Sequence, residues 1–303
     1  MPVVKAAGGV APGRKRTRAA PVEAKTDFGT DDLSHETDLD RAKREAFLRS
    51  KGIDPKQPFQ LEIWPDGVRE IPNDYARSAI FTVRNKREPR ASFQGAVIFH
   101  VEKTVRISYT GVELRADDDE LVWQQILDYA KRLALGEAVA FNLHQICVDL
   151  NWSVNERNYQ RVRMCISRLK ANEVKVENER SGKGIGISLI RDYDFEGAGT
   201  KGTKYRVWLD PRLIMLFAGR SSTRIAWQEY RNLKPIARRL YDYVASHKHP
   251  FPLKLETFHQ MCASDCQSER KWRFQVKEAC AELEEKNMVR RAWVADDLIY
   301  SER

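Results

Sequence analysis

The stretch that decides the fold runs from Asn142 to Ala171 and reads NLHQICVDLNWSVNERNYQRVRMCISRLKA. Its apolar side chains recur at helical spacing before and after a turn at residues 151–154, so it predicts two helices joined by a short turn. One face of the second helix carries an apolar stripe that we expect to be buried, made of Val162, Cys165, Ile166 and Leu169. Two helices joined in this way form the core of helix-turn-helix proteins.

Elements on either side of this stretch complete the order of a winged helix. Before it, residues 117–133 predict a helix and residues 139–141 a short strand. After it, two β-rich runs at 174–179 and 184–191 predict a hairpin, which we interpret as the wing. Helix, strand, helix, turn, helix and hairpin is the order of elements in a winged helix.

The same order returns nearer the C-terminus. The second set of predicted elements comprises helices at 235–247, 255–262 and 268–286, a strand at 251–253 and a hairpin at 289–300. A shift of 115 residues places HQIC at 144–147 on HQMC at 259–262 and gives 8 identities in the 33 ungapped positions from 142 to 174. A duplicated unit is the simplest account of this repetition.

The chain is therefore predicted to be α+β, with two tandem winged-helix domains related by internal duplication. We expect the first domain and its preceding linker at residues 57–209, and the second domain at 210–303. Residues 1–56 combine a basic run at 14–18 with an acid-rich segment at 27–40 and few large apolar side chains. Such a composition cannot bury enough surface to offset the entropy of ordering, so we expect a disordered N-terminal tail.

The overall charge indicates the class of partner. The net charge of +9 and the pI of about 9.3 favour a polyanion, which is commonly nucleic acid and more rarely an anionic membrane surface. No apolar run approaches the ~18 residues that a transmembrane helix needs. The five cysteines lack CxxC spacing, so they predict thiols in a reducing cytoplasm rather than a zinc site or disulfides.

The helix predicted from Asn155 carries a basic face opposite its apolar stripe. The side chains that we expect to contact DNA from this face and its flank are Arg157, Gln160, Arg161, Arg163, Met164 and Arg168. Arginine can bond guanine with two nitrogens, glutamine can pair with adenine, and a further arginine can hold phosphate. The alternative is a solvated basic face without a partner, and the winged-helix order favours DNA.

The helix predicted at 268–286 offers a second such face along its first half. Its later turns carry Glu282, Glu284 and Glu285, which would repel phosphate. The expected DNA contacts of this helix are Arg270, Lys271, Arg273, Phe274 and Lys277. The two hairpins add expected backbone contacts from Lys183 in the first unit and from Arg290 and Arg291 in the second.

Three patterns resemble catalytic motifs but lack features that catalysis requires. GAGTKGTK at 197–204 departs from the phosphate-binding loop GxxxxGK[ST] and precedes a β-rich run instead of a helix. HKH at 247–249 closes a predicted helix and has no suitably placed third ligand. The four acids at 117–120 begin a helix, where the macrodipole stabilises negative charge. We therefore predict a non-enzymatic protein with no catalytic residue, no metal and no cofactor.

Four strings carry a likeness to a known family. They are PNDYARSAIFT at 72–82, YTGVELRADDDELVWQQ at 109–125, PLKLETF at 252–258 and AWV at 292–294. In length and order they resemble the TrfA-like replication initiators of broad-host-range plasmids. The likeness extends from about Trp64 to the C-terminus, and the tail and the first recognition helix match least.

The resemblance implies a plasmid replication initiator that binds directly repeated iterons at the origin. It implies local opening of AT-rich DNA and recruitment of the host replicative helicase, with help from the host initiator protein. It further implies a monomer on DNA, an inactive homodimer, no membrane association, and a location in the bacterial cytoplasm on plasmid DNA. The rival function is a winged-helix transcriptional regulator, because the same scaffold serves both.

Members of this family also carry a short motif for the host sliding clamp ahead of the folded part. The corresponding residues here are Gln60, Leu61, Ile63 and Trp64, which depart from the usual Gln-Leu-x-Leu-Phe ending. An extended segment that offers three apolar side chains to a pocket is a plausible docking peptide. The alternative is that these side chains pack on the first domain.

Overall fold

The computed structural model describes residues 65–303 except 135, 179–182, 198–201 and 214–221. The predicted tail at 1–56 and the candidate clamp motif at Gln60–Trp64 lie outside the described residues. Within the described part, no helix is long and apolar enough to cross a membrane.

The stretch at 142–171 forms the two predicted helices. The elements around it are α3 (Asp119–Ala130), β6 (Val139–Asn142), α4 (Leu143–Asp149) and α5 (Glu156–Lys170). Asn142 and Asn155 cap α4 and α5, because their side-chain oxygens accept the backbone N–H groups of Gln145 and Asn158 at 2.8 and 2.9 Å. The predicted apolar stripe of α5 is buried, which confirms the orientation of this helix.

A three-stranded sheet lies beside these helices. Four strands follow α5 in the chain: β7 (Asn172–Asn178), β8 (Lys183–Ile187), β9 (Asp192–Glu196) and β10 (Lys204–Trp208). The three-stranded sheet consists of β6, β9 and β10, and β10 is the middle strand that pairs with both others. Phe141 of β6 stands opposite Tyr205 of β10, and Val139 opposite Val207, with all four side chains buried. These apolar pairs fix the register.

The prediction that residues 174–191 form the wing of the first unit is wrong in its pairing. β7 and β8 do form the predicted hairpin, but β7 pairs with β4 (Val105–Val112), which pairs with β3 (Ser92–Ile98) in a four-stranded sheet. Val174 and Ile107 from this sheet are buried in the core. The hairpin beside β6 is β9–β10 instead.

The C-terminal part contains the second set of predicted elements. They are α8 (Pro235–Ala245), β12 (Leu253–Lys254), α9 (Leu255–Cys262), α10 (Glu269–Glu285), β13 (Arg291–Ala295) and β14 (Leu298–Glu302). Ser268 caps α10, and its hydroxyl accepts the backbone N–H of Lys271 at 3.3 Å. The strand order β12–β14–β13 matches β6–β10–β9. In each sheet, the strand that comes last in the sequence is the middle strand.

The 115-residue register of the eight identities differs from the register of the helices. α9 begins 112 residues after α4, and α10 begins 113 residues after α5. At the helical offset, buried Leu143 and Ile146 correspond to buried Leu255 and Phe258. The aligned HQIC and HQMC strings therefore occupy different turns of their helices, and the duplication stays a prediction.

The remaining elements include a strand pair that connects the part of the chain with α5 to the part with α10. They are β1 (Val68–Pro72), α2 (Asn73–Ala76), β2 (Phe81–Thr82), β5 (Leu114–Arg115), the 3-10 helix η1 (Pro211–Leu213), β11 (Ser222–Ala226) and α7 (Trp227–Tyr230). β1 pairs antiparallel with β11 along five residues of each strand. This sheet crosses the boundary predicted between residues 209 and 210.

A buried cluster of charged side chains also joins the two parts. Arg239 of α8 is fully buried and lies 2.7 Å from Asp242 and 3.9 Å from Glu120 of α3. The neighbouring Arg238 donates to the carbonyl oxygen of Ala116 at 2.7 Å. The Tyr230 hydroxyl donates to Asp242 at 2.8 Å. Burial and the nearby Glu120 carboxylate raise the pKa of Asp242 to about 7.

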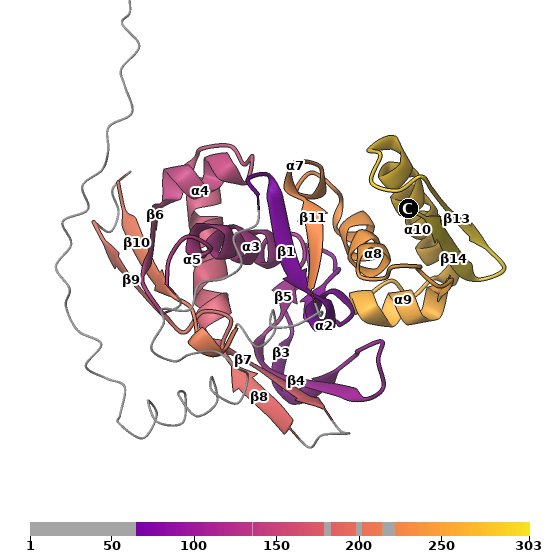
Figure 1. Cartoon of the computed structure of the whole chain (residues 1–303), viewed down its shortest axis with the longest axis horizontal. Helices are drawn as coiled ribbons and strands as arrows, with labels where there is room; N and C mark the ends of the chain where they lie inside the picture. Colours follow the sequence, from indigo (N-terminus) through magenta and orange to yellow (C-terminus); the bar gives the residue numbers. More distant parts are fainter. Residues whose placement is uncertain (1–64, 135, 179–182, 198–201, 214–221) are drawn as a thin grey trace, which may run out of the picture. The chain divides into compact units, whose positions relative to one another are not determined.

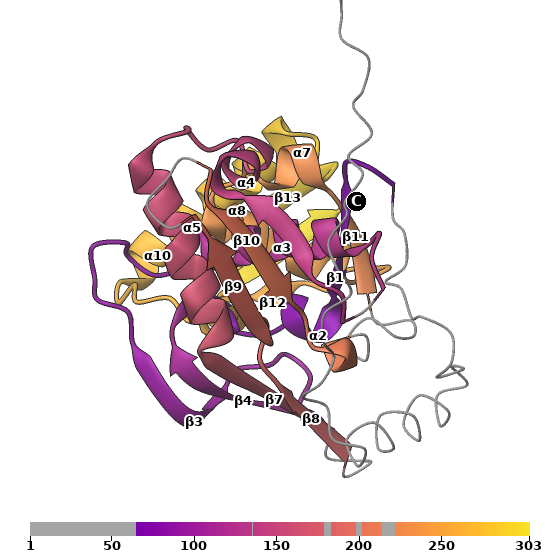
Figure 2. The same cartoon turned by 90° about the vertical axis from the view of Figure 1, so that its left-hand side faces the viewer.

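The described elements place α5 and α10 on the same side. In Figure 1 the β9–β10 hairpin lies at the left and the β13–β14 hairpin at the right, with α5 and α10 between them. Figure 2 shows both helices toward the left, whereas β1 and β11 lie on the right. The two long helices thus lie on the same side of the described residues and are separated along one direction.

Candidate nucleic-acid interface

The outward face of α5 carries three of the predicted DNA contacts. Arg157 and Gln160 are exposed on the first turns of the helix. Met164 lies one turn further along and is 47% exposed. This face can offer a guanidinium, an amide and a thioether to the groups at the edge of a base pair.

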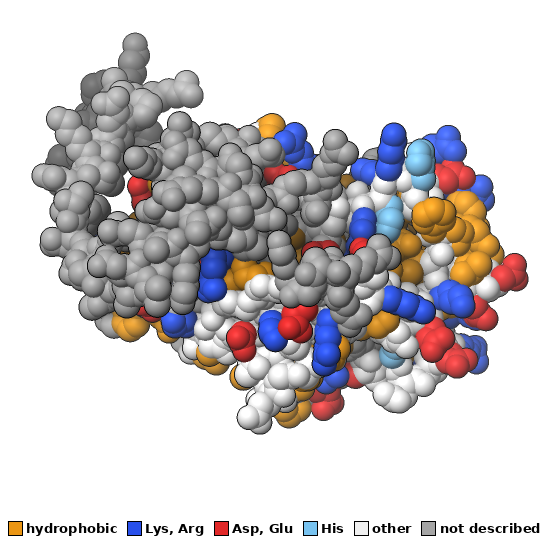
Figure 3. Space-filling view, turned by 60° about the horizontal axis from the view of Figure 1, so that its bottom comes forward, with side chains coloured by type: hydrophobic (Ala, Val, Ile, Leu, Met, Phe, Trp, Pro, Cys, Tyr) orange, Lys and Arg blue, Asp and Glu red, His pale blue; other side chains and the backbone are white. Residues whose placement is uncertain are grey.

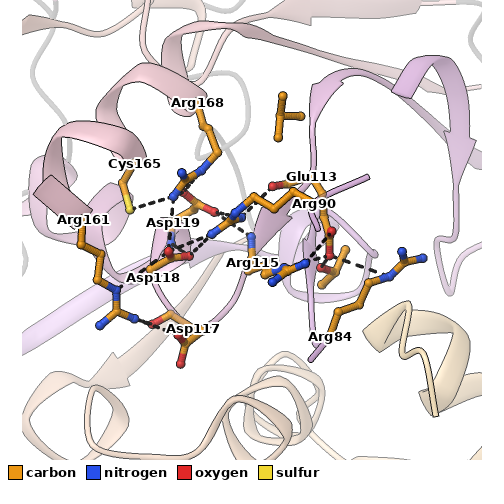
Figure 4. Close-up of polar contacts among 12 residues, drawn as sticks. Arg84, Arg90, Glu113, Arg115, Asp117, Asp118, Asp119, Arg161, Cys165 and Arg168 are labelled. Atoms are coloured by element: carbon orange, nitrogen blue, oxygen red, sulfur yellow. Dashed lines mark hydrogen bonds and ion pairs between the residues drawn. The ribbon is translucent and has the colours of Figure 1, made fainter. Parts of the chain in front are cut away.

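Arg161 is held by neighbouring side chains of the protein. Its Nη2 donates to the Asp117 carboxylate at 2.8 Å and to the Asp117 carbonyl oxygen at 3.0 Å. Its guanidinium lies over the Trp152 ring, 4.0 Å from the ring centroid. Lys86 also pairs with Asp117, at 2.7 Å. Figure 4 shows Arg161 and Asp117 at one end of a larger cluster of charges.

Arg168 belongs to that cluster and is not on the outward face of α5. Its side chain is only 11% exposed and lies 2.7 Å from Asp119 and 3.3 Å from Asp118. Arg90 reaches the same two carboxylates at 2.7 and 2.8 Å (Figure 4). The predicted position of Arg168 is therefore corrected: four charged groups neutralise one another beneath the helix.

The acids at the start of α3 act as helix caps and as countercharges. Asp118 caps α3 by accepting the backbone N–H of Asp119 at 2.9 Å, which agrees with the predicted role of this acidic run. Burial alone raises the pKa of Asp118, but Arg90 and Arg168 outweigh it and lower this pKa below its ordinary value. Burial and the Asp118 charge raise the pKa of Asp119 to about 6.

The same acids could suggest a metal site. Ligand atoms of Asp118, Asp119 and Cys165 lie within 4.8 Å of one another. Arg90 and Arg168 already contact both carboxylates, so a cation would have to displace two guanidinium groups. The donor set therefore fits an internal ion cluster better than a metal centre.

Arg163 flanks the outward face and pairs within its own helix. Its Nη1 lies 2.5 Å from the carboxylate of Glu156, two turns earlier on α5. This hydrogen bond raises the pKa of Arg163 above its ordinary value. Glu156 is exposed, so DNA phosphate and Glu156 can compete for the same guanidinium.

The predicted DNA contacts of α10 lie in its first half. Arg270, Lys271 and Lys277 are exposed, and Phe274 between them is 61% exposed. Arg273 differs because it pairs with Asp297 in the turn between β13 and β14. The exposed cations and the aromatic ring occupy the half of α10 that lies before its acidic turns.

The predicted hairpin residues are in different settings. Arg290 pairs with Glu302 of β14. The Arg291 guanidinium lies 4.7 Å from the ring centroid of Trp293, which stacks on Tyr300. Lys183 is the first residue of β8, opposite Asn178, and its side chain lies outside the described residues.

Charged side chains of both signs occur together on the surface of the described residues. On the face drawn in Figure 3, positive and negative side chains alternate over the described residues. Trp152, Lys86 and Asp117 were not predicted as part of the interface. Trp152 was visible in the turn before α5, but its contact with Arg161 depends on the packing of the turn against the helix.

Comparison with known proteins places the chain in a family. A sequence model of the TrfA protein family matches residues 30–303. The chain belongs to the TrfA family of plasmid replication initiators. It is 45% identical to the Escherichia coli plasmid replication initiator protein TrfA over 291 residues, which are 95% of this chain and 76% of that protein. The TrfA-like resemblance seen in the sequence is confirmed.

The TrfA-family fold also occurs in a solved structure of low sequence identity. Domains 2 and 3 of RctB are similar to this chain with a TM-score of 0.55 and 12% identity. The match covers 76% of this chain and 96% of the RctB fragment. At this identity the likeness concerns the fold alone, and it supports the α+β arrangement described above.

Proposed function

We propose that this TrfA-family initiator binds directly repeated iterons at a plasmid origin, with α5 and α10 as the reading helices of two winged-helix units. The repeated strand order β6–β10–β9 and β12–β14–β13 beside two pairs of helices supports this proposal. The main support is that α5 and α10 lie on one side of the described residues (Figure 2), and that Arg157 on α5 and Arg270, Lys271 and Lys277 on α10 are exposed. The domain boundary at 209/210 belongs to the same proposal.

The remaining steps of initiation are proposed from family membership. The bound protein would open AT-rich DNA without catalysing a reaction and recruit the host replicative helicase with the host initiator. It would act as a monomer in the cytoplasm and be inactive as a homodimer. The segment at Gln60–Trp64 remains a candidate for binding the sliding clamp.

The site on DNA is expected to be directional, because the two reading faces differ. α5 offers Arg157, Gln160 and Met164, whereas α10 offers Arg270 and Phe274. One chain should cover two successive major grooves about one helical turn apart, with unlike half-sites. We expect inversion of one half-site at constant spacing to reduce binding to the level of random duplex, as measured by electrophoretic mobility shift.

The mass of the complex provides the second readout of this experiment. Light scattering on the intact site should give one chain per repeat. Equal binding to the inverted site, or a two-fold dimer on a palindrome, would contradict the tandem arrangement and favour a transcriptional regulator.

The exposed cations of α10 are expected to set part of the salt dependence of binding. Replacing Arg270, Lys271 and Lys277 together by Ala should lower the slope of log affinity against log salt by nearly three, because each phosphate contact contributes about 0.9. Fluorescence anisotropy with a random duplex over a series of salt concentrations measures this slope. Arg132→Ala is the control, since Arg132 is exposed and pairs with Asp66 just before β1. An equal slope change in the control would remove α10 from the contact surface.

A further inference from the structure

Four side chains meet at the N-terminal end of α3. Asp117 lies 2.7 Å from Lys86 and 2.8 Å from Arg161, and Trp152 supports the Arg161 guanidinium from one face. The Asp117 carboxylate is partly exposed, as are Arg161 and Lys86. Both cations are therefore accessible to a competing anion.

The hydrogen bonds of Arg161 limit what it can contact. A guanidinium can bond an acceptor pair through two edges, Nη1 with Nη2 or Nε with Nη2, and both edges include Nη2. In Arg161, Nη2 already donates to the carboxylate and to the carbonyl oxygen of Asp117, and Nε lies 3.9 Å from the Asp118 carboxylate. While this pair exists, Arg161 cannot make the two-nitrogen contact with guanine O6 and N7 that identifies this base.

We propose that Asp117 is a positioning residue that keeps Arg161 paired within the free protein, and that binding of a guanine-containing site transfers Arg161 from Asp117 to the DNA. Lys86 remains paired with Asp117 after the transfer, so the carboxylate does not face the DNA without a countercharge. The inference rests on the proposed DNA-binding role of α5. It adds a step in which an internal ion pair is exchanged for a base contact.

Relative strengths decide the direction of the exchange. A partly exposed ion pair contributes up to about fivefold in an equilibrium constant. A two-nitrogen contact with guanine discriminates about 5- to 150-fold against another base. The exchange is therefore favourable on a site with guanine at this position, and affinity is lower than it would be without Asp117.

The test is a double-mutant cycle on a duplex selected from a random library by the unmodified chain. Asp117→Asn should tighten binding to this duplex about three- to fivefold, because the exchange no longer breaks an ion pair. In an Arg161→Ala background the same substitution should change affinity less than about 1.5-fold. Lys86→Gln should weaken binding in the unmodified background and have no effect beside Asp117→Asn.

Controls separate this exchange from simpler effects. Asp66→Asn makes the same change in net charge beside Lys131 and Arg132, and it should leave affinity unchanged. Asp117→Glu should restore the original affinity, and unfolding midpoints should match in all variants. Equal tightening in both Arg161 backgrounds would show general charge repulsion, and weaker binding by Asp117→Asn would show a fixed support for Arg161. Either result overturns the exchange but keeps the proposed function, whereas failure to select any duplex contradicts both.

Discussion

Replacing Arg239 by Ala is expected to lower the free energy of unfolding by about 3 to 5 kcal/mol, because it leaves the buried Asp242 carboxylate without its close cation and Glu120 with Arg238 alone. Arg239 is fully buried between Asp242 of its own helix and Glu120 of α3. It also donates to the carbonyl oxygen of Ala76 at 3.2 Å, so its removal leaves backbone acceptors unpaired as well. Urea denaturation followed by circular dichroism measures the loss.

The matched control for this prediction is Arg206→Ala. Arg206 pairs with Asp194 at 2.6 Å across β9 and β10, but both side chains are about half exposed. An exposed pair of this kind contributes at most about 1 kcal/mol. If the Arg239 and Arg206 variants lost similar stability, the cluster between α3 and α8 would not hold the two parts together.

Replacing Arg168 by Ala is expected to lower the free energy of unfolding by about 2 to 3 kcal/mol. The loss is smaller than for Arg239 because Arg90 still neutralises Asp118 and Asp119. Differential scanning fluorimetry and urea denaturation measure it. DNA affinity of the folded variant should change less than its stability, since Arg168 lies beneath the helix.

Arg157→Ala is the control on the same helix. Arg157 is exposed, so its removal should change stability by less than about 0.5 kcal/mol and should weaken DNA binding. A variant of Arg168 that folds with normal stability but fails to bind DNA would return Arg168 to the reading face.

Apolar periodicity is sufficient to predict the long helices α5 and α10 of this fold. The stripe from Val162 to Leu169 on α5 is buried as expected, and the residues Trp272, Val276, Ala279 and Leu283, which have the same helical spacing, are buried on α10. Their spacing is a local property of the sequence and can be read without knowing the partner. The start of each helix is also predictable, because Asn155 and Ser268 are good capping residues.

Strand pairing is not predictable in the same way. β9 has the sequence DYDFE and lacks the continuous β-rich pattern of β7, so local pattern favours the nearer run at 174–191 as the wing. In the structure β9 pairs with β10, and β10 pairs with β6, which ends at Asn142, 50 residues before β9 begins at Asp192. Such partners depend on distant residues, which spacing alone does not reveal.

Among the candidate DNA contacts, exposure is predictable from local sequence, whereas ion-pair partners are not. Exposure of Arg157, Gln160 and Phe274 follows from helical geometry. The partners of Arg161 and Arg168 come from Asp117–Asp119, more than 40 residues earlier, where the sequence indicates only the start of a helix. A basic side chain on a predicted helix can therefore be assigned to DNA only when the acidic side chains near it in the structure are known.

The antiparallel pairing of β1 with β11 has a consequence for how the DNA itself behaves. Two domains on a flexible linker adjust their separation to each site, and part of the binding energy is used to order the linker. Here a five-residue strand pair and the buried Arg239 cluster connect the parts that carry α5 and α10. On the proposed function we therefore expect α5 and α10 to keep a fixed separation. A repeat whose half-sites are slightly too close or too far apart must twist or bend to fit, so the mechanical strain is carried by the double helix.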